Sequence, residues 1–179
     1  LEAQRAAAIQ LARNGRYDDS MVYMEKVLHA KGDTNFDFLA LSAIETDADT
    51  RSGLLKNFDR LLAKYPDNSQ LIFGKALLMQ QGGDAEGALR LLEKNPPQDG
   101  EIAPTLLRAR LLQSLNRGDE ALPLLQKTIR QYPDDKRLAL TYARTLVEQN
   151  RMDEAKTQFA SLVQQYPEDD ELLFSLALV

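Results

Sequence analysis

Apolar side chains recur at helical spacing in one short stretch after another along this chain. Leu122, Leu125 and Ile129 form one such stripe, three or four residues apart. Positions with this spacing share one face of an α-helix, whereas a half-buried strand would alternate apolar and polar residues. No stretch shows that alternation. The pattern therefore predicts an all-α protein with no sheet.

Turn residues separate the apolar stripes and set the ends of the predicted helices. Within turns stand Asn14-Gly15 and Gly82-Gly83, and Pro follows Tyr at other breaks because Pro cannot continue a helix. Asp119 and Asp153 stand where a helix N-cap is expected. The expected helices cover residues 2–14, 18–31, 35–47, 51–64, 69–81, 85–94, 102–115, 119–131, 136–149, 153–165 and 170–179.

The stripes are organised by a repeat with a period of about 34 residues. One series of mostly small residues is Ala8, Ser42, Ala76, Ala109, Ala143 and Ala177. A second series, twelve positions further along each repeat, is Ser20, Leu54, Ala88, Ala121 and Ala155. A bulky series follows at Met24, Phe58, Leu92, Leu125 and Phe159, and Tyr-Pro recurs at Pro66, Pro133 and Pro167. Small residues at fixed positions allow two helix axes to approach to roughly 8–10 Å.

These registers resemble the tetratricopeptide repeat (TPR), a helix–turn–helix unit of about 34 residues. The resemblance covers the whole chain as five repeats and the start of a sixth: 1–34, 35–68, 69–101, 102–135, 136–169 and 170–179. It implies a TPR solenoid, a right-handed superhelix of antiparallel helix pairs, forming a single array. The sequence departs from the family pattern at Gly32, at Leu54 and at 95–100, where repeat three ends irregularly and one position early.

The resemblance also implies that the first helices line a concave groove that binds a partner polypeptide. The family's binding positions fall on Arg5, Ile9, Phe36, Leu39, Phe73, Leu77, Leu106, Arg110, Leu140 and Arg144. We expect this groove to hold an extended segment or a helix mainly by apolar burial, with Arg110 and Arg144 supplying directional hydrogen bonds. In the alternative interpretation, Phe36, Leu39, Phe73 and Leu106 pack within the array.

The TPR clamp that grips chaperone carboxyl termini uses Lys and Asn at set groove positions. In this chain those positions carry Ile9, Ala40 and Leu106, so the clamp pattern is absent.

Composition excludes several kinds of chemistry. The chain has no Cys and one His, so disulfides, Cys-ligated zinc and a multi-histidine metal site are excluded within it. The 22 basic and 27 acidic residues give a net charge of −5, which argues against nucleic-acid binding. The acidic runs 134–135 and 168–171 follow Pro at helix starts, where carboxylates offset the helix dipole. We find no catalytic constellation and predict neither an enzyme nor a cofactor.

The Tyr residues that precede Pro and the single His are both interpreted as structural residues. Tyr65, Tyr132 and Tyr166 could stack nucleobases, but their recurrence before Pro favours packing at helix ends. His29 is expected on the outer surface, exposed to solvent.

The end of the sequence is unusually apolar for a solenoid terminus. Residues 172–179 read Leu-Leu-Phe-Ser-Leu-Ala-Leu-Val, whereas solenoids normally end in a polar capping helix. We therefore expect a fragment of a longer protein, whose last helix offers a surface for self-association. No apolar run is long enough to span a membrane.

The leading functional hypothesis is a protein-binding scaffold or adaptor. Residues 58–66 and the absence of Cys resemble bacterial outer-membrane TPR lipoproteins, which bring cell-wall hydrolases to a carboxyl-terminal processing protease. That resemblance implies a periplasmic location and those partners; a cytoplasmic location is the alternative. Other hypotheses are an envelope assembly factor, or a substrate-recruiting arm of an enzyme whose other domains lie elsewhere. RNA binding is disfavoured by the charge.

Overall fold

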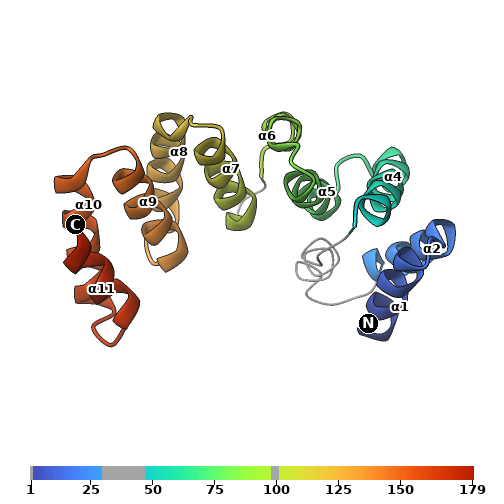
Figure 1. The fold of residues 1–179 in the computed structure, drawn as a ribbon, viewed down its shortest axis with the longest axis horizontal. Coiled ribbons are helices and arrows are strands. Elements are labelled where there is room, and N and C mark those ends of the chain that lie inside the picture. Colours follow the sequence, from blue (N-terminus) through green and yellow to red (C-terminus); the bar gives the residue numbers. More distant parts are fainter. Residues whose placement is uncertain (1, 30–46, 98–100) are drawn as a thin grey trace. The chain divides into compact units, whose positions relative to one another are not determined.

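The computed structural model describes residues 2–29, 47–97 and 101–179, and all regular structure in these ranges is helical (Figure 1). The prediction of an all-α protein is therefore confirmed. The helices are α1 (Glu2–Arg13), α2 (Tyr17–Leu28), α4 (Ala48–Lys64), α5 (Ser69–Gln81), α6 (Ala85–Lys94), α7 (Ile102–Ser114), α8 (Gly118–Gln131), α9 (Lys136–Glu148), α10 (Met152–Gln165) and α11 (Asp170–Leu178). The helix expected over 35–47 lies outside the described residues except for Asp47.

The described chain forms two compact units, residues 1–98 (unit 1) and 99–179 (unit 2). Within unit 1, α1 packs on α2, α2 on α4, α4 on α5 and α5 on α6. Within unit 2, each helix from α7 to α11 packs on the next, and α7 also contacts α9. The division falls at the irregular end of repeat three. A single array over 1–179 stays a prediction.

Small residues are buried where the two helices of a repeat pack together. Ala109 and Ala121, on the contacting pair α7 and α8, are both fully buried, and so are Ala143 and Ala155 on α9 and α10. In the first repeat, the Ser20 hydroxyl donates a hydrogen bond of 2.8 Å to the carbonyl oxygen of Ala8. A small side chain at these positions therefore lets the paired helices approach closely.

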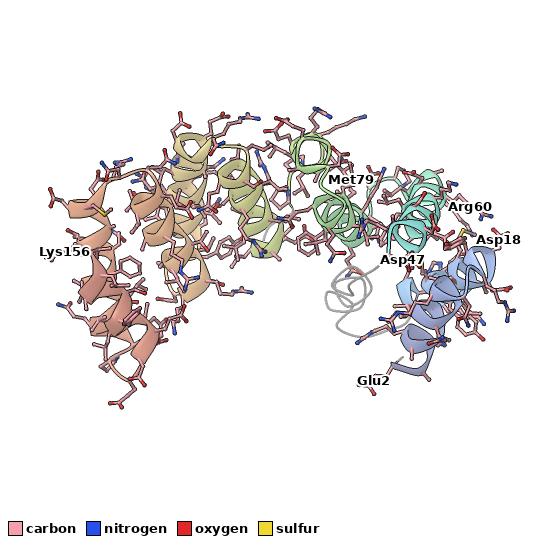
Figure 2. The ribbon with its side chains drawn as sticks, viewed as in Figure 1. Glu2, Asp18, Asp47, Arg60, Met79 and Lys156 are labelled. Atoms are coloured by element: carbon pink, nitrogen blue, oxygen red, sulfur yellow. The ribbon has the colours of Figure 1, made fainter. Side chains whose placement is uncertain are left out.

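Ion pairs add to the apolar packing between α2 and α4. Arg60 pairs with Asp18, and Figure 2 shows these two side chains between the two helices. Lys64 pairs with Glu25 further along the same two helices. Exposed pairs of this kind contribute little because solvent screens them, so burial of residues such as Phe58 dominates the interface.

One turn conformation recurs between the two helices of a repeat. Gly15, Gly83, Asn116 and Asn150 all have positive φ, between 57° and 86°. Gly and Asn are the residues that adopt this left-handed region at least cost. At the start of α4, the Asp47 carboxylate accepts the Thr50 N–H at 2.8 Å, and the helix begins at Ala48 rather than at 51.

The expected N-caps at Asp119 and Asp153 are wrong. Arg117 and Arg151 hold the N-cap positions of α8 and α10 and make no side-chain cap hydrogen bond. Because each helix begins earlier than expected, the two Asp residues lie in its first turn. There their carboxylates still offset the helix dipole.

Side-chain caps instead mark the helices that follow the Tyr-Pro turns. Asn68, Asp135 and Asp169 stand two positions after Pro and accept a backbone N–H from the first turn of α5, α9 and α11. The Tyr-Pro turn thus ends one repeat and supplies the cap of the next.

The cap at Asp135 predicts a loss of stability in acid. The hydrogen bond from the Arg137 side chain, with help from two backbone N–H groups and against the smaller effect of burial, holds the pKa of Asp135 below its ordinary value of 3.8. A lowered pKa in the folded state stabilises the fold above 3.8, and this contribution is lost as pH falls through the folded value.

The Asp135→Asn variant isolates that contribution, because Asn still caps helices well. We expect the variant to be less stable than the wild type in urea unfolding at about pH 6, and the difference to shrink at about pH 3. A difference independent of pH would show that the charge of Asp135 does not stabilise the fold.

Gly53 allows an unusually close aromatic contact in unit 1. A Cβ atom at this position of α4 would lie 2.0 Å from Cε1 of Tyr17, whose hydroxyl donates to the Asp49 carbonyl oxygen at 3.1 Å. Gly→Ala inside a helix normally stabilises by up to about 1 kcal/mol. Here we expect Gly53→Ala to destabilise by about 1 kcal/mol instead, because the ring must move.

Thermal or urea unfolding followed by circular dichroism measures this effect, with Ser52→Ala as the control. Ser52 is exposed on the same helix, so its replacement is expected to be neutral or slightly stabilising. Equal effects of the two variants would contradict the proposed contact.

Candidate functional site

Of the ten groove residues expected from the sequence, eight lie in the described part of the chain. Phe36 and Leu39 lie outside it. In unit 1, Arg5, Ile9 and Leu77 are half-buried, and Phe73 is only 8% exposed. Phe73 therefore offers little surface to a partner, and its side chain packs inside the unit.

The four expected residues of unit 2 are more accessible. Leu106 and Leu140 are half-buried, whereas Arg110 and Arg144 are exposed. Leu106 and Arg110 stand four positions apart on α7, as do Leu140 and Arg144 on α9, so each pair shares one side of its helix.

Two further apolar residues continue this register; the sequence marked them as part of the apolar segment 172–179 but not as groove residues. Phe174 is 65% exposed and Leu178 is 70% exposed, both on α11. They stand one repeat length after Leu140 and Arg144, so the repeat register contained the signal. We define the first-helix face of unit 2 by six residues: Leu106, Arg110, Leu140, Arg144, Phe174 and Leu178.

Polar contacts join the three helices that carry this face. The Gln113 side-chain amide donates to Thr145 Oγ1 at 2.9 Å and to Glu148 Oε2 at 2.7 Å, which links α7 to α9. Arg144 pairs with Glu171, which links α9 to α11. Residues from three successive repeats are thereby held on neighbouring helices.

Arg110 differs from the other charged groups around this face. Within the part of the chain that the structure describes, it makes no ion pair and no hydrogen bond. Arg144 is paired, and Arg137 is held by Asp135 at 2.6 Å. The face therefore presents one uncompensated cation beside apolar side chains.

A separate open depression of about 510 Å³ lies at the turn before α11. Lys136, Tyr166 and Asp169 are among its lining residues. Lys136 pairs with Asp169 and lies 5.0 Å from the centre of the Tyr166 ring. Its ammonium group therefore already has partners within the chain. This depression shares no residue with the first-helix face.

Tyr65, the tyrosine at the end of α4, packs against side chains of α2. Its ring is half-buried, and its hydroxyl donates to Glu25 Oε1 at 2.7 Å. Because that proton is committed, His29 Nε2, 2.8 Å away, must be the donor to the Tyr65 oxygen. His29 is exposed as predicted, and the hydrogen bonds from Lys64 and Tyr65 lower the pKa of Glu25. The cluster joins α2 to the end of α4.

Among the described residues, no three His, Cys, Asp or Glu side chains are grouped so that they could hold a metal ion. Nor does any helix in the described ranges have the length and apolar character needed to cross a membrane.

Comparison with known proteins agrees with this architecture. Residues 112–177 match the family described as tetratricopeptide repeat. The chain is 69% identical over 143 residues to the TPR repeat-containing protein PA4667 of Pseudomonas aeruginosa, a match that covers 80% of this chain and 24% of that protein. The chain thus spans about a quarter of the length of this relative.

Solved structures show the same fold. The TPR protein TTC0263 of Thermus thermophilus aligns with a TM-score of 0.62 and 21% identity, over 98% of this chain and 96% of that one. A tetratricopeptide repeat protein of Parabacteroides merdae aligns at 0.65 and 18% identity, over 98% and 70%. YrrB, described as a TPR protein with an unusual peptide-binding site, aligns at 0.60 and 16% identity, over 87% and 80%.

The solved structures share the TPR fold with this chain, and residues 112–177 match the TPR family. The expectation drawn from the registers of small and bulky residues is confirmed at this level.

Proposed function

We propose that this chain is a non-enzymatic scaffold that binds a partner polypeptide on its first helices, with the first-helix face of unit 2 as the principal site. The observation that carries the proposal is the shared register of the first helices α7 and α9, where Arg110 and Arg144 are exposed and Leu106 and Leu140 are half-buried. Partly accessible apolar side chains beside Arg residues are typical of interaction surfaces.

The energetic argument favours a polypeptide over a small ligand. Leu106 and Leu140 lie at equivalent positions of two first helices in contact, α7 and α9, and such an arrangement suits a helix or an extended segment. A few buried aromatic or aliphatic anchors commonly supply most of the affinity in such complexes.

Selection of binders from a phage-displayed peptide library tests the proposal. We expect selected peptides to lose at least about tenfold in affinity for the Arg110→Asp and Arg144→Asp variants. Arg130→Asp is the control, because Arg130 is also exposed but lies on α8, a second helix of unit 2. Melting curves establish that all three variants fold. Peptides that bind every variant equally would place the site elsewhere.

A narrower form of the proposal concerns the pathway. In this narrower proposal, the chain is part of an envelope adaptor on the periplasmic side of the bacterial outer membrane. The adaptor recruits cell-wall hydrolases to a carboxyl-terminal processing protease. Its support is the absence of Cys and the envelope-like residues 58–66. Co-purification of such a protease from native membranes would support it, and a reading frame without an export signal would refute it.

A second candidate function is a recruiting arm within a larger enzyme or assembly factor. It is favoured by the length of the Pseudomonas relative, of which this chain spans 24%. Activity assays on a full-length protein, with and without the repeats, would distinguish it from a free-standing scaffold.

A further inference from the structure

The start of α8 and the start of α10, the two second helices of unit 2, carry the same polar contacts. Each helix follows an Arg N-cap that makes no side-chain cap hydrogen bond. In both, Nε of that Arg lies 2.6 Å from a carboxylate oxygen of the Glu three positions later, which is Glu120 in α8 and Glu154 in α10. The differences between the two starts therefore lie in the other residues of their first turns.

Pro123 removes a backbone hydrogen bond from α8. It is the sixth residue of the helix, so it lies inside it. Because Pro has no N–H, it cannot donate to the Asp119 carbonyl oxygen four residues back, and its ring crowds that oxygen. One repeat length later in α10 stands Thr157, whose hydroxyl donates to the Asp153 carbonyl oxygen at 2.9 Å. The equivalent acceptor thus loses its usual donor in α8 and gains an extra one in α10.

The first turn of α8 is weak for a second reason. It begins with Gly118, where α10 begins with Met152, and Gly loses more backbone freedom on folding than any other residue. The Glu120 N–H bonds to the carbonyl oxygen of the N-cap three residues back, the 3₁₀ pattern with poorer hydrogen-bond geometry. In α10 the Ala155 N–H bonds to the N-cap four residues back, as in a regular α-helix.

The start of α8 touches the neighbouring helix α9. A Cβ atom on Gly118 would lie 2.2 Å from Nε2 of Gln149, the C-cap residue of α9. Leu122 is 5% exposed and anchors the segment in the core. Because α8 packs on both α7 and α9, opening of its start removes part of the packing that joins these two first helices.

We infer that residues 118–123 of α8 form a segment that unfolds locally and reversibly while α7, α9 and the rest of α8 stay folded. The ion pair between Arg117 and Glu120 and the burial of Leu122 favour the closed state. Pro123 and Gly118 favour the open state, since they weaken the helix exactly where it begins. Local opening of this kind occurs in parts of a fold that few backbone hydrogen bonds hold, and it requires no bound partner.

Amide hydrogen exchange of the wild-type chain, measured by NMR, tests the inference. The Leu124 N–H bonds to a carbonyl oxygen inside the segment, whereas Ile129 lies in the later part of α8. The equivalent residues of α10 are Gln158 and Val163. We expect Leu124 to be protected at least about tenfold less than Ile129, and Gln158 and Val163 to differ by less than about threefold.

Exchanging the residues at the two equivalent positions provides matched variants. Pro123→Thr restores the backbone donor, so it should raise the protection of Leu124 at least about tenfold and bring it close to that of Ile129. Thr157→Pro should create the same difference between Gln158 and Val163. Both substituted positions are exposed, so neither change disturbs the core directly.

Three outcomes would overturn the inference. The first is an equal pattern of protection in α8 and α10 of the wild type. The second is a Leu124 amide that stays poorly protected in Pro123→Thr. The third is an increase by one common factor at every amide of unit 2 in that variant, because exchange would then report global unfolding. Pro123→Thr decides the matter even if Thr157→Pro fails to fold, since replacing Pro inside a helix favours the helix.

Discussion

Phe159→Ala is expected to lower the free energy of unfolding by about 3–5 kcal/mol. Phe159 belongs to the bulky register of the second helices, and its side chain on α10 is only 2% exposed. Its replacement removes apolar area from the core of unit 2 and leaves a cavity that rigid neighbouring helices fill only in part.

Urea unfolding followed by far-ultraviolet circular dichroism measures the loss, and Phe174→Ala provides the matched control. Both residues are Phe on helices of unit 2, but Phe174 is 65% exposed. We expect Phe174→Ala to change stability by no more than about 0.5 kcal/mol. If the two variants proved equally destabilised, the assignment of Phe159 to the core would be untenable.

Ala143→Leu is expected to destabilise the fold by about 1–3 kcal/mol. Ala143 on α9 and Ala155 on α10 are both fully buried where these helices pack together. The larger Leu side chain at this position forces the helix axes apart or drives neighbouring side chains out of their rotamers.

The control for this variant is Ala177→Leu. Ala177 stands one repeat length after Ala143 in the same small-residue register, but on α11 it is exposed. Leu is nearly as good a helix former as Ala, so we expect a change within about 0.5 kcal/mol. A large loss on Ala177→Leu would mean that the terminal helix is packed like the interior ones.

The sequence predicted the ends of a helix correctly wherever turn residues such as Pro or Gly mark them clearly. The predicted ranges 69–81 and 85–94 match α5 and α6 at both ends, because the Tyr-Pro turn and Gly82-Gly83 interrupt helices unambiguously. The start of α4 at Ala48 was expected at 51, since the Asp47 cap lacks a Pro or Gly before it. Arg117 and Arg151 were missed as N-caps because Arg carries no acceptor that would mark such a position.

The sequence predicted the candidate site only as a set of equivalent positions in successive repeats. The fifth position of the first helix gave Phe73, Leu106 and Leu140 as equivalent candidates, and it extends to Phe174. The structure separates them, because Phe73 is only 8% exposed whereas Leu106 and Leu140 are half-buried. It also distinguishes Arg144, which pairs with Glu171, from Arg110, which is left free among the described residues.

The sequence by itself determined the all-helical class, the period of the repeat and the small residues at which paired helices pack. These properties depend on backbone preferences and on side-chain spacing along one helix, which are local. Only the tertiary structure decided which members of each register are buried, paired or accessible. Burial and charge compensation depend on which neighbouring helix covers a residue, and identical positions in successive repeats have different neighbours.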